Sequence, residues 1–234
     1  MKREHLDTKE FTIRRVWTVE DLPVLEAAVT LPEPQTVNDA CTRRIRRYYR
    51  LQSRMFLRYC QLQLYPQAAD AYRAALSVSA PLPCFHAELT CHITQNRQGL
   101  WSLYTQLRES APCAHFYLRR WGDTWDLHKG CLLPLPAFFP PRSPWKSHLL
   151  ALVEESIHRQ ESMGIARYHD HARRALRKHF QPKNYYLTDG GLIFFYPMYA
   201  IAPAEEGIPT FFVPLGAECP LWADPAAKQE QDLP

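Results

Sequence analysis

Apolar and polar positions alternate so that the chain divides into strands, then helices, then strands again. Residues 11–19 and 23–31 are rich in β-branched and aromatic residues, and Glu20-Asp21 between them suits a tight turn. The beginning of the chain is therefore predicted to be a pair of strands.

A long helix is predicted next, because apolar residues recur at helical spacing from residue 39 to about Tyr65. Thr36 and Asp39 have the spacing of a capping box, which makes Thr36 the expected first residue of the motif. Pro66 is expected to break or kink the helix, since proline lacks the N–H and clashes with the preceding turn. A further helix is predicted over residues 67–76.

Shorter segments with strand composition follow, and they predict an antiparallel meander. These segments are residues 84–94, 100–108, 113–121 and 124–128. Gly122-Asp123 is expected to turn the chain between the last two strands.

Two more helices are predicted in the second half of the chain. Ser143-Pro144 is a typical helix start, with Ser as the N-cap and Pro at the first helical position, and Gly164 is a typical stop. The apolar residues of this helix share one face: Trp145, Leu149, Leu152, Val153 and Ile157. A second, basic helix is expected over residues 165–180.

The last predicted unit is an aromatic hairpin followed by a short strand. Residues 185–187 and 192–196 are strand formers on either side of Asp189-Gly190-Gly191, where glycine tolerates the positive φ of a tight turn. The whole pattern predicts an α+β fold, with helices packed on a mostly antiparallel sheet.

This hairpin segment closely resembles the end of a domain found in the anti-sigma factor RsiV, which senses lysozyme, and in peptidoglycan deacetylases of the PdaC type. The family pattern is an aromatic strand, "tddGl", an aromatic strand, "YeIAPyaaGip" and a final strand; here the segment is NYYLTDGGLIFFYPMYAIAPAEEGIPTFFVPL. The family's "GGAH" element corresponds to Ala111–His115, where Pro112 and Cys113 replace both glycines. The resemblance is best over residues 110–215, and it implies a stand-alone binding or sensory domain with the RsiV and PdaC accessory-domain fold.

The resemblance also implies a ligand-binding surface on the exposed loops, above all residues 196–207. The candidate binding residues are Tyr196, Tyr199, Glu205, Glu206 and His115. The implied ligand is a protein or a glycan. Core packing is the alternative interpretation of the aromatic residues Tyr196, Tyr199 and Phe211.

Length and composition are those of an ordinary globular protein, with 234 residues, of which 46% are apolar and 22% are charged. We expect a single domain over residues 1–220, with an N-terminal part over about 11–80 and a C-terminal part over about 81–220. Residues 221–234 are expected to form a flexible tail.

Seven cysteines without a CxxC pair favour free thiols in a reducing compartment over a disulfide framework. The N-terminus lacks the pattern of a signal peptide, and no segment approaches the roughly 20 apolar residues that span a bilayer. The sequence therefore predicts a cytoplasmic protein with no membrane partner.

The most basic segment lies in the first predicted helix, where residues 41–60 hold seven arginines and no acidic residue. Five of them form what we call the arginine stripe: Arg43, Arg47, Arg50, Arg54 and Arg58. The opposite side, predicted to be buried, holds Ile45, Tyr48, Met55, Tyr59 and Leu62. A solvated helix face explains the stripe, and the net charge of +4 is modest, so no nucleic-acid partner is predicted.

No nucleophile elbow, P-loop, dinucleotide fingerprint or HExxH motif is present, so no catalytic residue and no cofactor are predicted. Cys84 with His86 and Cys113 with His115 have strand spacing, and two such pairs would supply four zinc ligands. This spacing is not an established zinc signature, and no metal site is predicted. A glycan-processing enzyme or a Cys/His metal enzyme is the alternative to a binding domain.

Overall fold

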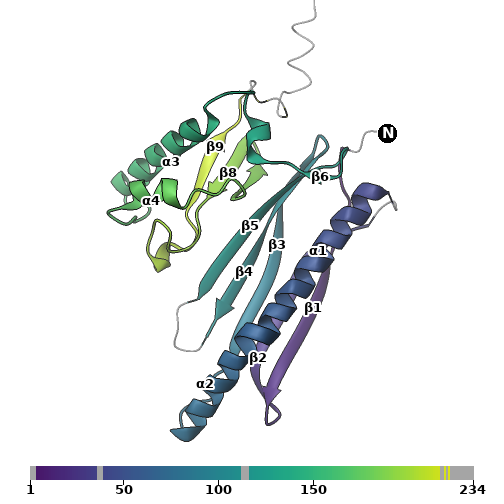
Figure 1. The fold of residues 1–234 in the computed structure, drawn as a ribbon, viewed down its shortest axis with the longest axis vertical. Coiled ribbons are helices and arrows are strands. Elements are labelled where there is room, and N and C mark those ends of the chain that lie inside the picture. Colours follow the sequence, from purple (N-terminus) through teal and green to yellow (C-terminus); the bar gives the residue numbers. More distant parts are fainter. Residues whose placement is uncertain (1–3, 36–38, 112–115, 217–218, 220, 222–234) are drawn as a thin grey trace, which may run out of the picture.

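The computed structural model describes residues 4–35, 39–111, 116–216, 219 and 221. It contains a six-stranded sheet and a three-stranded sheet, with helices packed on each (Figure 1). The predicted α+β class is confirmed, with the strands divided between two sheets.

The six-stranded sheet follows chain order. Its strands are β1 (Thr8–Val19), β2 (Leu22–Pro34), β3 (Phe85–Arg97), β4 (Leu100–Ser110), β5 (Tyr117–Asp126) and β6 (Cys131–Leu132). Neighbouring strands are antiparallel except β2 and β3, which run parallel because a long helical crossover connects them. The predicted hairpin of β1 and β2 is confirmed, and Glu20 and Asp21 both have positive φ in its turn.

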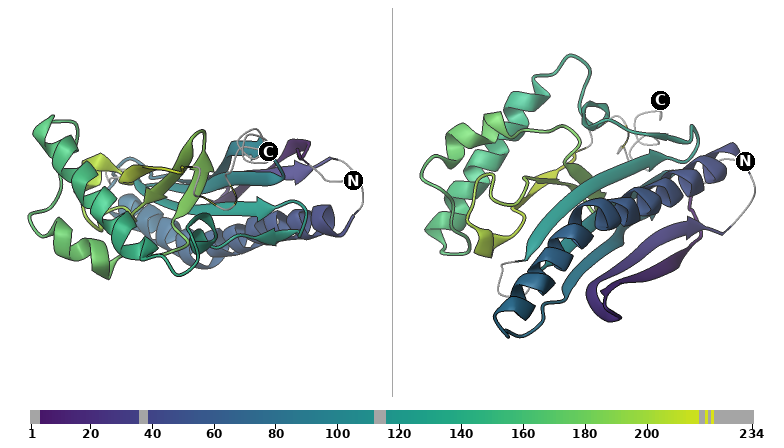
Figure 2. Two further views of the ribbon diagram at one scale, coloured as in Figure 1. Left: turned by 90° about the horizontal axis from the view of Figure 1, so that it is seen from above. Right: turned by 60° about the horizontal axis from the view of Figure 1, so that its bottom comes forward.

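The crossover is a helical rod that runs along one face of this sheet (Figure 2). It consists of α1 (Ala40–Tyr59), the π-helical segment η1 (Cys60–Leu64) and α2 (Tyr65–Ser77). The expected role of Asp39 as the last residue of the capping box is not observed, because Asp39 is itself the N-cap of α1. One of its side-chain oxygens accepts the Thr42 N–H at 2.7 Å. Thr36 lies outside the described residues.

Pro66 was predicted to break or kink the helix; the rod is not broken there, but α1 gives way to the π-helical segment η1 before the proline, and α2 follows as predicted. The N–H of Tyr65 donates to the carbonyl of Cys60, five residues earlier, so the hydrogen-bond ladder changes to π-helical spacing just before the proline. This change accommodates a residue that has no N–H and whose ring crowds the preceding turn.

The predicted turn at Gly122-Asp123 is also wrong, because both residues lie inside β5. A Cβ on Gly122 would lie only 1.7 Å from the carbonyl oxygen of Tyr185, so glycine lets the second sheet approach closely. On the other face, Tyr48 and Tyr49 of α1 donate hydrogen bonds to the Asp123 carboxylate. Since successive strand residues point to opposite faces, β5 lies between α1 and the second sheet.

The second sheet carries its own helices. It is formed by β7 (Tyr185–Thr188), β8 (Gly191–Phe195) and β9 (Thr210–Pro214). Its helices are α3 (Trp145–Ser162) and α4 (Ala172–Lys178), with short 3-10 segments η2 (Leu135–Phe138) and η3 (Ala204–Glu206). The predicted hairpin of β7 and β8 is confirmed, and Gly190 has a φ of +78° in its turn.

Two expectations for these helices are wrong. The N-cap of α3 is Pro144 without any side-chain cap, so Ser143 does not cap the helix. The basic helix predicted over residues 165–180 is restricted to the seven residues of α4. Before it, the N–H groups of Arg167 and His169 donate to Glu206 and Ile201, and these long-range bonds replace helical ones. The stop at Gly164 is confirmed, with a φ of +65°.

Two clusters of buried side chains form the core, one beneath α1 and one between α3, α4 and the second sheet. The buried face of α1 consists of residues such as Ile45, Tyr49 and Phe56. Met55 and Leu62 were predicted on that face, but they are 63% and 54% exposed. The true face is therefore rotated away from the one that the sequence suggested. In the described parts of the chain, no helix combines the length and apolar character needed to cross a membrane.

Candidate ligand-binding surfaces

Of the two tyrosines predicted to bind a ligand, Tyr199 alone is at the surface. Tyr196 directly follows β8, is fully buried, and donates its O–H to the carbonyl of Leu176 on α4 at 3.1 Å. Tyr199 is 49% exposed and has a φ of +67°. A left-handed backbone is strained for a bulky residue, and strain of this kind is enriched at functional positions.

The loop that carries Tyr199 packs against the first residues of β5. The neighbouring Met198 is buried, and its sulfur accepts the N–H of Leu118 at 3.3 Å. Farther along the loop, a Cβ on Gly207 would lie 3.7 Å from Leu118 Cδ1. Phe116 lies just before this strand, is 38% exposed, and has the Arg108 guanidinium 5.7 Å from its ring centre. We call the exposed residues Tyr199, which follows Met198 in the loop, and Phe116, which lies two residues before Leu118, the aromatic end.

The acidic candidates differ in their surroundings. Glu205 is exposed. Glu206 is partly buried, and its Oε1 accepts the backbone N–H of Arg167 at 3.0 Å and lies 3.8 Å from the Nε of the same residue. Glu206 therefore holds the segment before α4 in place. His115, the last candidate, lies outside the described residues.

A small hollow of about 210 Å³ adjoins the aromatic end through Arg108. It is lined by His86 and Glu88 of β3 and by Arg108 and Ser110 of β4. These residues alternate with core residues such as Leu89, so they lie on the face of the sheet away from α1. The hollow offers polar contacts beside the exposed aromatic rings.

The Cys/His pairs do not form a site in the part of the chain that the structure describes. His86 Nδ1 lies 3.5 Å from Glu26 Oε2, while Cys113 and His115 fall outside the described residues. Within the described ranges, no three His, Cys, Asp or Glu side chains gather so that they could hold a metal ion. Burial raises the pKa of the Cys60 and Cys91 thiols to about 12, so neither is a thiolate nucleophile near neutral pH.

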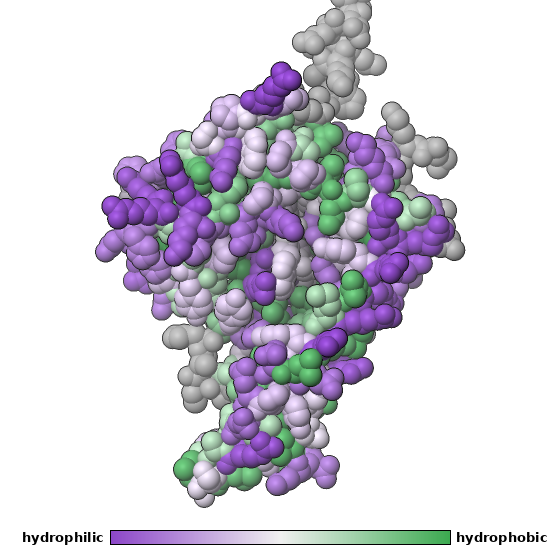
Figure 3. All heavy atoms as spheres, viewed as in Figure 1, coloured by the Kyte–Doolittle hydropathy of each residue, from purple (hydrophilic) through white to green (hydrophobic). Residues whose placement is uncertain are grey.

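The arginine stripe follows the outer side of α1, where Figure 3 shows hydrophilic side chains with hydrophobic ones among them. Arg50 of the stripe has partners within the protein. It donates to Glu33 Oε1 at 2.7 Å, and its guanidinium lies 4.0 Å from the centre of the Phe11 ring. Arg47, Arg54 and Arg58 are exposed. Tyr48 and Tyr59 pack toward the core, as predicted.

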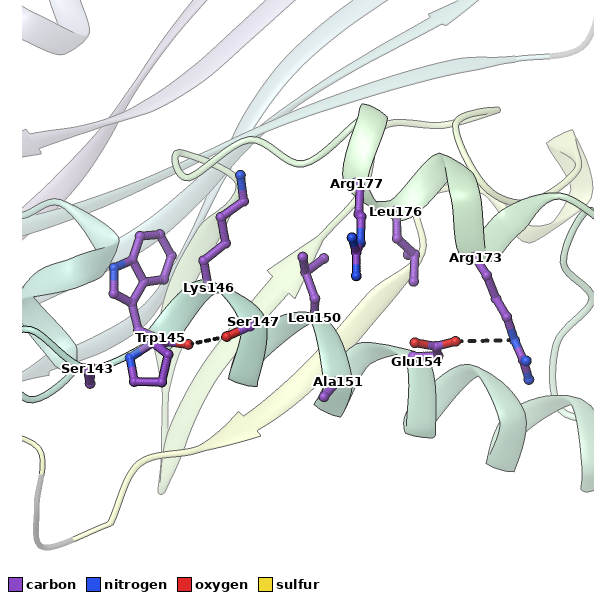
Figure 4. Close-up of a pocket in the computed structure, with 11 residues that line it drawn as sticks. Ser143, Trp145, Lys146, Ser147, Leu150, Ala151, Glu154, Arg173, Leu176 and Arg177 are labelled. Atoms are coloured by element: carbon purple, nitrogen blue, oxygen red, sulfur yellow. Dashed lines mark hydrogen bonds and ion pairs between the residues drawn. The ribbon is translucent and has the colours of Figure 1, made fainter.

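A groove of about 690 Å³ lies between α3 and α4 (Figure 4). Its charged residues are Lys146 and Glu154 from α3 and Arg173 and Arg177 from α4. Its apolar lining includes Trp145, Leu150 and Leu176. One ion pair crosses it, with Arg173 Nε at 3.5 Å from Glu154 Oε1. The sequence drew no attention to these side chains as a group, because they come from two helices.

Sequence reasoning also missed Arg120, which lies where the two sheets meet. Its guanidinium donates to Gln106 Oε1 at 2.6 and 3.1 Å and lies 4.2 Å from the centre of the Tyr104 ring. Tyr186 of β7 and Phe195 of β8 supply two further rings at about 6 Å. Alternation in β4 and β5 places Tyr104, Gln106 and Arg120 on one face, but nothing local indicates that β7 covers them.

Residues 137–216 match a family described as a protein of unknown function, DUF3298. This segment contains α3, α4, the second sheet and the loop that carries Tyr199. No curated protein matches the chain in sequence.

Two crystal structures of DUF3298 family proteins are similar to most of the chain. The protein from Bacteroides fragilis NCTC 9343 is 15% identical, with a TM-score of 0.65 over 92% of each chain. The protein from Pseudomonas aeruginosa PAO1 is 15% identical, with a TM-score of 0.54 over 92% of this chain and 93% of the other. At this level of identity the likeness shows the fold alone.

Proposed function

We propose that this protein is a non-enzymatic binding or sensory domain that holds a protein or glycan ligand at the aromatic end. The observation that carries the proposal is Tyr199, a large side chain held exposed on a left-handed backbone. Such a conformation costs about 1–2 kcal/mol for a residue other than glycine. The hydrogen bond from the Leu118 N–H to the Met198 sulfur, at 3.3 Å, ties the residue next to Tyr199 to β5.

The chemistry of the aromatic end suits a ligand with both apolar and polar groups. Tyrosine and phenylalanine offer large rigid surfaces at a low cost in conformational entropy, and tyrosine is enriched at binding hot spots. Arg108 and the hollow beside it add hydrogen-bond donors and acceptors within the same region. The resemblance of the segment to the RsiV and PdaC domains supports the same role.

Immobilised protein and a Tyr199→Ala variant, each incubated with native lysate and with a glycan array, provide the test. We expect the wild-type protein to retain one protein or one class of glycan, and the variant to lose most of it. Met163→Ala is the matched control, because Met163 is a 67% exposed apolar residue at the far end of α3. Identical retention by the wild-type protein and Tyr199→Ala would refute the proposal, and so would failure to retain anything.

A further inference from the structure

The groove between α3 and α4 has more positive than negative charge. Arg173 and Glu154 form an ion pair across it at 3.5 Å. Lys146 and Arg177 have no carboxylate within 4.0 Å among the residues that the structure describes; the Lys146 ammonium instead lies 4.7 Å from the centre of the Phe180 ring. Two cations therefore face the groove without an anionic partner from the described chain.

Between these cations the lining is apolar and firmly held. The Trp145 ring stacks on Phe139 at 5.8 Å and packs against Phe180 at 6.2 Å. Leu176 is buried in the core beneath α4, and Leu150 packs at the edge of the same core. Figure 4 shows Lys146 and Arg177 reaching into the space between the two helices on either side of Leu150. An occupant would therefore meet an apolar floor between two positive charges.

We propose that this groove binds an acidic peptide segment, with carboxylates paired to Lys146 and Arg177 and an apolar side chain against Leu150 and Leu176. Charge complementarity selects an anionic occupant, because the lining carries three cations and one carboxylate. The volume of about 690 Å³ is far more than a single inorganic anion would fill. The groove is partly open to solvent, which suits a peptide chain, whereas small-molecule sites enclose most of their ligand.

The site is separate from the aromatic end in the elements that build it. The groove is formed by α3 and α4, and the aromatic end by the start of β5 and the loop before η3. A variant in one surface therefore leaves the other intact, and each proposal stands or falls alone.

Fluorescence anisotropy with a labelled eight-residue peptide of alternating Glu and Leu tests the groove directly. We expect saturable binding at low salt that weakens as salt rises, and no binding of the analogues with Gln or Lys in place of Glu. Exposed ion pairs are worth up to about fivefold in affinity each, so Lys146→Gln and Arg177→Gln should each weaken binding up to about fivefold. The double variant should weaken it up to about 25-fold.

Arg174→Gln is the matched control, because Arg174 is an exposed arginine of α4 that does not line the groove. It removes the same charge and should leave the affinity unchanged. Arg177→Glu should in turn allow the Lys peptide to bind. Far-UV circular dichroism of each variant checks that the fold is intact.

Several outcomes would overturn the proposal. Equal weakening by Arg174→Gln and Arg177→Gln would mean diffuse charge attraction and no defined site. Complete displacement of the peptide by millimolar inorganic phosphate would mean a simple anion site, and the peptide assignment would be wrong. Absence of saturable binding at low salt would remove the proposal altogether.

Discussion

Asp123 is the most unusual ionisable residue of the described chain. Its side chain is buried between α1 and the six-stranded sheet, where Tyr48 and Tyr49 donate to its two oxygens at 3.0 and 3.1 Å. The Trp125 indole N–H donates in turn to the Tyr49 oxygen at 3.1 Å. Burial raises the pKa of Asp123 to about 6, although the hydroxyl hydrogen bonds act in the opposite direction. The carboxylate thus carries a desolvation cost near neutral pH.

Asp123 should make the protein less stable as the pH rises from about 4 to 6. In this window the folded state binds more protons than the unfolded state, whose aspartate titrates near 3.9, so the free energy of unfolding falls with pH. The contribution is fully present below about pH 4 and lost above about pH 6, and it amounts to roughly 3 kcal/mol. Urea unfolding of the wild-type protein and Asp123→Asn across this range measures it.

The variant lacks this titration, so the difference in stability between the two proteins should change steeply between pH 4 and 6. Asp70→Asn, at an exposed position, is the control for loss of a surface carboxylate. A flat difference between the wild-type protein and Asp123→Asn would show that the buried carboxyl does not titrate in this window.

Two glycines allow backbone effects to be separated from packing effects. Gly122→Ala places a Cβ at 1.7 Å from the Tyr185 carbonyl oxygen, and we expect a loss of about 3 kcal/mol or more as the sheets move apart. At Gly190 no atom lies within 4 Å of the added Cβ, so Gly190→Ala should cost only the strain of its φ of +78°, about 1 kcal/mol. Chemical denaturation measures the stability of each variant. Equal losses of stability in Gly122→Ala and Gly190→Ala would contradict the close approach at Gly122.

At the scale of elements, the beginnings of α1 and α3 differ in how they are capped. Asp39 accepts the Thr42 N–H at 2.7 Å, so Asp39→Ala should lower stability by about 1 kcal/mol. The Ser143 hydroxyl has no hydrogen-bond partner in the described part of the chain, so Ser143→Ala should change stability by less than about 0.5 kcal/mol. Thermal unfolding distinguishes the two, and a larger loss for Ser143→Ala would restore Ser143 as the cap.

The elements that were predicted correctly are those fixed by local pattern. Turn residues and strand composition located the β1–β2 and β7–β8 hairpins, and glycine marked the end of α3. The helix prediction was wrong over residues 165–171 because the backbone of this segment bonds to the distant loop at Ile201 and Glu206. No local pattern reveals these partners. The turn prediction at Gly122 was wrong for a similar reason, because glycine is needed there for the close approach of β7.

The candidate surfaces show the same division. The resemblance pointed to the loop with Tyr199, but spacing alone does not tell the exposed Tyr199 from the buried Tyr196 three residues earlier. The groove combines Lys146 with Arg177, which are 31 positions apart and meet only because α4 packs beside α3. Sites assembled from separate elements in this way require the tertiary structure.

At the scale of the whole molecule, the architecture is layered. The rod of α1, η1 and α2 covers one face of the six-stranded sheet (Figure 1). On the other face, β7 approaches closely at Gly122. Ser102 ties the layers together, because its hydroxyl oxygen accepts the Leu187 N–H at 2.8 Å and also bonds to Thr124. Among the described residues, the outer side of α1, the aromatic end and the groove between α3 and α4 are open to solvent.

The outer side of α1 is where a nucleic acid would have to bind, and we predict that it does not. Arg50 is already engaged by Glu33 and Phe11, so at most the other four arginines of the stripe could contact phosphates. Four phosphate contacts would give a log-affinity against log-salt slope of about −3.6, so any binding should collapse on going from low to physiological salt. The tyrosines near the stripe, Tyr48 and Tyr59, face the core and offer no stacking platform for bases.

Titration with labelled duplex and single-stranded DNA and RNA at about 150 mM salt should therefore detect no binding. The variant with Gln at positions 47, 54 and 58 and a control with Gln at positions 14, 15 and 174 should behave like the wild-type protein. Sub-micromolar affinity that the first variant loses and the control retains would contradict the prediction. The arrangement of the side chains matters more here than their charge, because a single row of arginines beside exposed Leu51 and Met55 lacks the aromatic surface that nucleic-acid recognition adds to phosphate attraction.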